Sequence, residues 1–215
     1  MTKLKIVLLS LFFILLGNLN AKGQWLVGPA GGVSFTDIVM ENINVQTEYG
    51  VNPVAGILIT YLPENNKPGV KLLFSRMQYG FYEKTNTDPI HYKNSGINFQ
   101  FLSYLYFPIK KFRVSIEAGP GISYFNNPVI LPNQNNSVLP DFSFNNINKM
   151  MLDLEGGIGF AQPIGKFHIS AHSTFAFSTS KIFKNYLGYS NPLSIQAWFG
   201  VQYEVFQHPK KQTQF

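Results

Sequence analysis

The chain has 215 residues, no cysteine and a formal net charge of +6, from 17 basic and 11 acidic residues. The lack of cysteine excludes disulfides, thiol catalysis and a lipid anchor on cysteine. Setting aside Lys3, Lys5 and Lys22 of a predicted signal leaves 14 basic against 11 acidic residues, and a charge of +3 is too small to indicate a nucleic-acid partner. Charged residues reach only 13% and aromatic residues 15%, which favours a surface that faces lipid.

Residues 1–23 are predicted to be a signal peptide. Lys3 and Lys5 form its basic region, and the apolar run Ile6–Leu16 follows. This run is shorter than the roughly 20 apolar residues that span a bilayer. Cleavage is expected after Gly23, with Ala21 as the alternative site.

Apolar and polar or very small residues alternate through most of the remaining chain, most regularly over Phe112–Tyr124. A period of two predicts a β-strand with one apolar and one polar face. Eight segments are predicted to be strands, in chain order: Trp25–Phe35, Pro53–Leu62, Val70–Glu83, Gly96–Pro108, Phe112–Tyr124, Lys149–Pro163, Phe167–Phe177 and Pro192–Phe206.

The third segment has the least regular pattern. Leu73, Met77, Tyr79 and Phe81 are expected to face outward, with Phe74, Arg76 and Gln78 inward, although the second set is also apolar at its start.

The connections between the segments alternate long and short, which is typical of outer-membrane barrels with long extracellular loops and short periplasmic turns. The predicted fold is therefore all-β: an eight-stranded antiparallel transmembrane β-barrel, an up-and-down meander with periplasmic N- and C-termini. It is predicted to occupy residues 24–206 in the bacterial outer membrane, with a periplasmic tail at 207–215 and its longest loop at 126–146.

Aromatic residues near the strand ends are expected to form girdles at the two membrane interfaces. The predicted girdle residues are Trp25, Phe35, Tyr61, Tyr79, Phe107, Tyr124, Phe167, Phe177 and Tyr203.

Most charged strand residues fall on the inward parity, and an eight-stranded barrel is just wide enough for side chains to fill it. We therefore expect a plug of paired charges, with a proton or solute path as the alternative. Inward Gly119, Gly121, Gly157 and Gly159 would leave room for it. The predicted lumen network contains Arg76, Arg113, Glu117, Asp153, Glu155, His168, His172 and Glu204.

His168 and Ser170 share a face and could act as base and nucleophile. Outer-membrane lipid A deacylases resemble this pair, but here it is expected inward and near the periplasmic end, whereas such an enzyme needs it facing lipid at the outer rim. A metal site with His172 lacks a third ligand, and no nucleotide-binding or HExxH motif is present. We expect no catalytic residue, no metal and no cofactor.

The aromatic strand FLSYLYFPI at 101–109, the basic turn Lys110–Lys111 and IEAGPGISYF at 116–125 resemble the PorT-like outer-membrane β-barrel family of Bacteroidetes-type bacteria. The resemblance implies an outer-membrane location, and name-giving members act in secretion and gliding. The expected partners are outer-membrane lipid and lipopolysaccharide, the barrel-assembly machinery during insertion, and an envelope protein. The expected function is a non-enzymatic barrel with binding or docking loops; a secretion accessory and a lipid A hydrolase using His168 and Ser170 are the alternatives.

Overall fold

The computed structural model describes residues 23–41, 47–64, 68–84, 90–130, 147–184 and 190–207. The predicted signal peptide, apart from residue 23, and the tail beyond residue 207 lie outside these ranges, as does most of the long loop at 126–146. Within the described ranges, no helix has both the length and the apolar character needed to cross a membrane.

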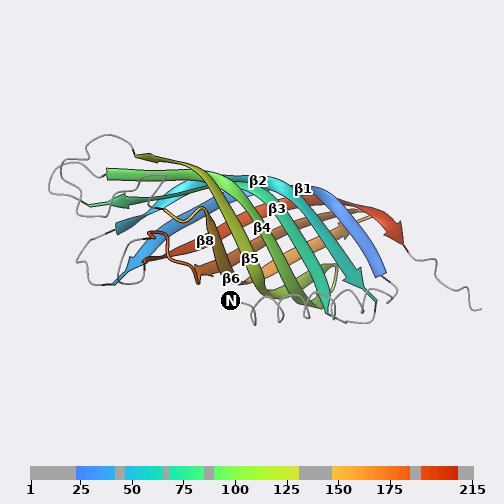
Figure 1. Ribbon diagram of the computed structural model, residues 1–215. Coiled ribbons are helices and arrows are strands. Elements are labelled where there is room, and N and C mark those ends of the chain that lie inside the picture. Colours follow the sequence, from blue (N-terminus) through green and yellow to red (C-terminus); the bar gives the residue numbers. More distant parts are fainter. Residues whose placement is uncertain are drawn as a thin grey trace, which may run out of the picture.

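Eight antiparallel strands pair in chain order and close into a barrel, because β1 also pairs with β8 (Figure 1). The strands are β1 (Gly23–Met40), β2 (Thr47–Pro63), β3 (Gly69–Glu83), β4 (Ile90–Ile109), β5 (Phe112–Ile130), β6 (Met150–Ile164), β7 (Phe167–Ser178) and β8 (Ser190–Gln207). The predicted number of strands and the meander order are confirmed.

Several strands extend farther than the alternating pattern predicted. β1 runs to Met40, β2 begins at Thr47, and β4 begins at Ile90, so segments expected to be polar loops are largely paired backbone. The alternation of apolar and polar residues stops before the strands do. A strand that projects beyond the lipid can carry polar side chains on both faces while its backbone remains paired.

The barrel has two different ends. At one end, two-residue turns join β4 to β5 and β6 to β7, and Lys110 (φ 55°) and Gly165 (φ 62°) adopt the left-handed conformation that such tight hairpins require. At the other end lie the longer connections, including the one between Ile130 and Met150. We call these the short-turn end and the long-loop end.

The register sets the tilt of the strands. Following paired residues once around the barrel from Trp25 returns to Phe35, ten residues farther along β1 (35 − 25). With the usual strand spacings, a shift of this size across eight strands gives a tilt of about 40°. Moving from one strand to its higher-numbered neighbour therefore rises about 3 Å toward the long-loop end.

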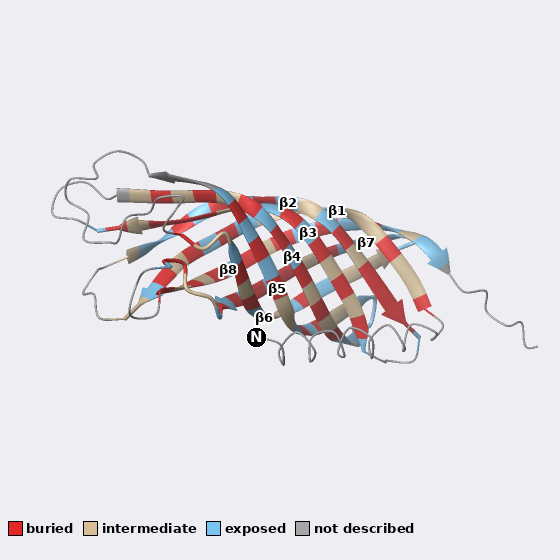
Figure 2. Ribbon diagram, in the orientation of Figure 1, coloured by how far each residue is buried: buried red, intermediate tan, exposed pale blue. Residues whose placement is uncertain are grey.

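Side-chain direction alternates along every strand, so exposed and buried positions form a chequered pattern (Figure 2). On β5, for example, Ile116 is 59% exposed and the adjacent Glu117 is 1% exposed. The outer surface is apolar over most of its height and the interior contains most of the buried polar residues. This distribution is the reverse of that in a water-soluble protein and suits a wall surrounded by hydrocarbon.

The outward and inward faces predicted for seven strands match the structure, but the prediction for β3 was wrong. Lys71, Leu73, Ser75, Met77 and the other odd-numbered residues of β3 point inward, whereas the even-numbered residues point outward. Both parities of β3 are partly apolar, so the pattern of this strand alone could not define its lipid face. Pairing with β2 and β4, whose faces are unambiguous, determines it.

Candidate functional site in the barrel interior

Glu117 is the centre of a buried cluster that crosses the interior. Its Oε1 forms an ion pair with the Lys71 ammonium group and accepts a hydrogen bond of 2.6 Å from Ser115 Oγ. The same oxygen lies 2.9 Å from His172 Nδ1. Lys71, Glu117 and His172 lie on β3, β5 and β7, which are not neighbours, so these contacts link opposite parts of the wall.

The surroundings of this cluster are buried and partly aromatic. Lys71 is 6% and Glu117 1% exposed. The Lys71 ammonium lies 4.7 Å from the centre of the Tyr104 ring, and the His172 ring stacks on Trp198 with centroids 4.2 Å apart. A buried ammonium group needs both a counter-charge and further polar or π contacts, and it has both here.

Glycines in the wall make room for the carboxylates. A Cβ on Gly159 would overlap Glu117 Oε1, His172 Nδ1 and Ser115 Oγ. Gly121 plays the same part for Glu155, whose carboxylate lies directly over it. Two of the four glycines expected to provide space for lumen side chains therefore do so for named carboxylates.

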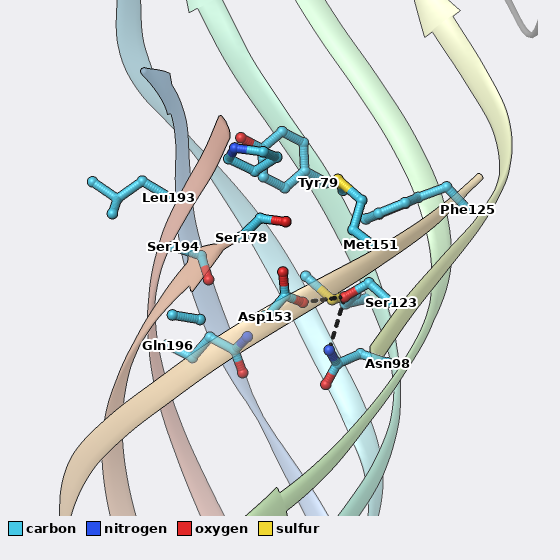
Figure 3. Close-up of a pocket in the computed structure, with 13 residues that line it drawn as sticks. Tyr79, Asn98, Ser123, Phe125, Met151, Asp153, Ser178, Leu193, Ser194 and Gln196 are labelled. Carbon is cyan, nitrogen blue, oxygen red and sulfur yellow. Dashed lines mark hydrogen bonds between the residues drawn. The ribbon is translucent and has the colours of Figure 1, made fainter. Parts of the chain in front are cut away.

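A second polar layer lies closer to the long-loop end. Asn98 Nδ2 donates to Ser123 Oγ at 2.9 Å, and Ser123 Oγ donates to Asp153 Oδ2 at 2.9 Å, as Figure 3 shows. Gln100 Nε2 donates to Gln196 Oε1 at 3.0 Å, which joins β4 to β8 across the interior.

Glu155 is the exception among the buried carboxylates. Its side chain is 5% exposed, and neither carboxylate oxygen has a hydrogen-bond partner within the described part of the chain. Asp153 is its charged neighbour on the same face of β6. Glu117 therefore has its contacts concentrated on Oε1, with Oε2 unbonded, whereas both oxygens of Glu155 are without a described partner.

Above this layer, an aromatic and aliphatic cluster occupies the barrel mouth at the long-loop end. We call it the mouth cluster, and it consists of Ile38, Tyr79, Phe81, Tyr92, Phe125, Ile147, Met151, Ile182 and Phe183. Phe81 stacks on Tyr92 with centroids 4.9 Å apart, and Tyr79 OH donates to the Asp37 carbonyl oxygen. The sequence did not predict this cluster, because its members come from five strands, from Ile147 and from the segment 182–183.

The predicted lumen residues fall into separate groups rather than one network. Arg113 lies at the short-turn end, with its guanidinium 5.7 Å from the centre of the Tyr106 ring, and Glu204 at the same end is partly exposed. His168 is buried and inward, and Ser170 Oγ donates to the Gly200 carbonyl oxygen at 3.5 Å. A cavity at this end is lined by Arg113, His168, Ser170, Lys71 and other residues.

Arg76 must be removed from the predicted lumen set. It lies on the outward face of β3 and is exposed, because the whole strand has the opposite orientation to the one predicted. Lys71 is the cation that sequence reasoning missed. The sequence offered no decisive signal for it, because Lys71, Ser75 and Glu83 stand at odd positions while Arg76 and Gln78 stand at even ones, so that both parities of β3 contain polar residues.

Most of the predicted girdle residues lie on the outer surface in two rows. The row near the short-turn end contains Trp25, Phe107, Phe167 and Tyr203, and the row near the long-loop end contains Phe35, Tyr124 and Phe177. Two residues depart from the prediction. Tyr79 points inward into the mouth cluster, and Tyr61, although on the outward parity beside Trp25 (ring centroids 5.0 Å apart), is only 4% exposed.

Among the described residues, no group of three or more His, Asp or Glu side chains is placed to hold a metal ion. The described interior offers instead ion pairs, amide–amide bonds and aromatic contacts that connect strand to strand.

Comparison with known proteins gives a family and distant structural likenesses. The family model described as "Outer membrane protein beta-barrel domain" matches residues 18–181. No curated protein matches the chain.

Among solved structures, Ail of Yersinia pestis, in complex with the heparin analogue sucrose octasulfate, is 15% identical with a TM-score of 0.36, covering 85% of this chain and 99% of its own. Outer membrane protein W of E. coli is 15% identical with a TM-score of 0.39, covering 86% and 98%. The translocator domain of the autotransporter NalP from Neisseria meningitidis is 10% identical with a TM-score of 0.31, covering 94% and 97%. These likenesses are too distant to carry an argument about function.

Proposed function

Because the chain belongs to the outer membrane protein beta-barrel family, we propose that it is a plugged, non-enzymatic barrel whose long-loop end binds or docks a partner outside the cell. The protein is located in the bacterial outer membrane. Its wall provides the anchor, and its interior is proposed to carry no solute.

The contacts that cross the interior support the plug. Lys71, Glu117 and His172 connect three strands that are not neighbours, and Gln100 and Gln196 connect β4 with β8. Closer to the short-turn end, Gln202 Nε2 donates to the Leu26 and Leu58 carbonyl oxygens at 3.3 Å. An open channel would need these side chains to face a continuous water column instead of one another.

Conductance in planar lipid bilayers tests the plug. The expected result is no steady conductance above background for the wild-type protein. The matched variant replaces Lys71, Glu117 and Trp198 together by serine, which removes the crossing contacts and should produce measurable current if it folds. Reproducible ion-conducting steps in the wild-type protein would contradict the proposal, whatever the variant does.

The proposed orientation places the long-loop end outside and both termini in the periplasm, in line with the general rule for bacterial barrels. Because the chain contains no cysteine, single cysteines report the side directly. Lys184→Cys should react with a membrane-impermeant maleimide in intact cells, and Lys111→Cys only after the outer membrane is permeabilised. The opposite pattern would reverse the orientation.

A role as an accessory of a secretion system, as in PorT-like proteins, is the second candidate. Exposed Lys110, Lys111 and Lys166 at the tips of the short turns favour it, because they form a basic surface that an acidic envelope protein could contact. Crosslinking from Lys111→Cys in cells would identify such a partner, and reversing the charge of the two remaining lysines, Lys110 and Lys166, in that variant should abolish the crosslink. A crosslink that persists after charge reversal would argue against a basic docking surface.

A lipid A hydrolase is the least supported candidate. His168 and Ser170 are both 3% exposed and point into the interior, whereas the lipid substrate lies outside the wall. Mass spectrometry of lipid A from cells with and without the gene is expected to show the same acylation. Loss of an acyl chain that depends on Ser170 would overturn the non-enzymatic proposal.

A further inference from the structure

One charged residue interrupts the outer surface between the two aromatic rows. Among the described strand residues, Arg76 is the sole charged side chain on the outward parity at this height; its nearest charged companion on the outward face, Lys93, lies farther toward the long-loop end. Its immediate neighbours are apolar: Phe74 precedes it on the outward face and is 52% exposed, and Ala55 and Ile97 lie opposite it on β2 and β4.

The register defines the depth of Arg76. It pairs with Ile97, which pairs with Tyr124 of the aromatic row near the long-loop end. Two steps from strand to strand, from β3 to β4 and from β4 to β5, separate them, and at a rise of about 3 Å per step Arg76 lies roughly 6 Å below Tyr124. An extended arginine side chain spans that distance, so its guanidinium can reach the interface while its backbone stays within the apolar band.

The path from Arg76 to the interface is polar. Gln78 is the next outward residue of β3, and Ser95 lies opposite Gln78 on β4. Lys93 follows Ser95 on the outward face, opposite Gly80, which has no side chain to cover it. The β3–β4 pair thus presents a polar strip, consisting of Arg76, Gln78, Ser95 and Lys93, that begins inside the apolar band and ends beyond it.

No hydrogen bond or ion pair joins the Arg76 guanidinium to another described residue. A charged group on the lipid-facing side of a barrel costs about 2–4 kcal/mol at the midplane and less near the interface, so an anion at the end of the side chain is the natural compensation. Phosphate fits best, because the planar guanidinium presents two parallel N–H donors to its oxygens. Lys93, farther along the strip, adds a second positive charge.

We propose that the Arg76–Lys93 strip binds a phosphate group of an outer-leaflet glycolipid, the lipid A portion of lipopolysaccharide. The choice of leaflet rests on the proposed orientation with the long-loop end outside. In that orientation the strip lies at the depth where lipid A phosphates meet the acyl chains, and inner-leaflet phospholipids lie at the opposite row.

Native mass spectrometry of the full-length mature protein in detergent tests the site. The probes are lipid A with its phosphates, enzymatically dephosphorylated lipid A, and phosphatidylglycerol. We expect phosphorylated lipid A to bind the wild-type protein best, and Arg76→Leu to weaken that binding about tenfold, as the loss of a charge-assisted contact predicts. Arg76→Lys should retain part of it, and Lys111→Leu at the short-turn end is the matched control with no effect.

The outcomes are distinguishable. Equal binding to wild-type protein and Arg76→Leu, or no preference for the phosphorylated form, overturns the site. If phosphatidylglycerol binds more tightly than phosphorylated lipid A, and this binding depends on Arg76, the assignment to lipid A is overturned. Cysteine labelling at Lys184 and Lys111 separately shows whether the orientation or the site is at fault, and conductance measurements are independent of both.

A stability measurement gives a second readout that a purely structural arginine would not produce. In vesicles of zwitterionic lipid alone, Arg76→Leu should unfold at a higher urea concentration than the wild-type protein, because leucine suits the lipid face. Adding phosphorylated lipid A should stabilise the wild-type protein and leave the variant unchanged. Equal stabilisation of both proteins by lipid A would contradict the proposal.

Discussion

At the scale of single residues, the interior separates two kinds of buried carboxylate. Glu117 has a cation, a histidine and a hydroxyl group around one oxygen. Glu155 is equally buried but has no described hydrogen-bond partner. A buried charge is tolerated when it is paired and costly when it is not, so the same substitution should destabilise the protein at Glu117 but not at Glu155.

Replacement of each carboxylate by its amide tests this contrast. Glu117→Gln leaves the Lys71 ammonium without its counter-charge, and a loss of about 3–5 kcal/mol in unfolding free energy is expected. Glu155→Gln replaces a buried carboxyl group that has no described partner and should leave stability equal or higher. Urea unfolding in lipid vesicles, followed by tryptophan fluorescence, measures both. Similar losses in the two variants would show that Glu155 is as well compensated as Glu117.

At the scale of elements, seven strands could be oriented from the sequence because one parity was apolar and the other polar or small. β5 is the clearest case, with Ile116 outward and Glu117 inward as predicted. β3 could not be oriented in this way, since Leu73 and Phe74 are adjacent and both apolar. The error moved Arg76 and Tyr79 to the wrong sides of the wall and concealed Lys71. Only the pairing with β2 and β4 resolves it.

Cysteine substitution along β3 checks the corrected orientation. Phe74→Cys should react with a lipid-soluble maleimide, while Leu73→Cys, whose parent side chain is 2% exposed, should not. Ile116→Cys on β5 is the positive control, because its outward position was predicted and observed alike. Faster reaction at position 73 than at position 74 would restore the orientation predicted from sequence and return Arg76 to the interior.

At the scale of the whole molecule, the alternating sequence pattern predicted a closed barrel in the outer membrane. It did not predict which side chains meet inside that barrel. The alternation of long and short connections predicted eight strands in meander order. The contacts of Lys71 with Glu117 and of Gln100 with Gln196, like the mouth cluster, depend on which side chains meet across the interior. That information lies in the register and the tilt, which no single strand reveals.

A closed barrel held by continuous backbone pairing should resist detergent. The mature protein, extracted and loaded without heating in sodium dodecyl sulfate, is expected to migrate faster than the boiled sample, because the folded barrel is compact and binds less detergent. Gel electrophoresis with and without boiling measures the shift. Identical migration of both samples would contradict a stable closed barrel.

Following the paired residues once around the barrel gives a shift of ten residues along β1, and this fixed register restricts where residues can be inserted or deleted. One residue inserted within a paired strand would reverse the side-chain direction of every later residue in that strand, so that apolar side chains would face the interior and polar ones the lipid. A closed barrel has no edge strand at which the shifted pairing could stop. Insertions and deletions should therefore survive in the connections at the long-loop end, above all between Ile130 and Met150. The surface presented to the surroundings can diversify quickly while the wall keeps its dimensions.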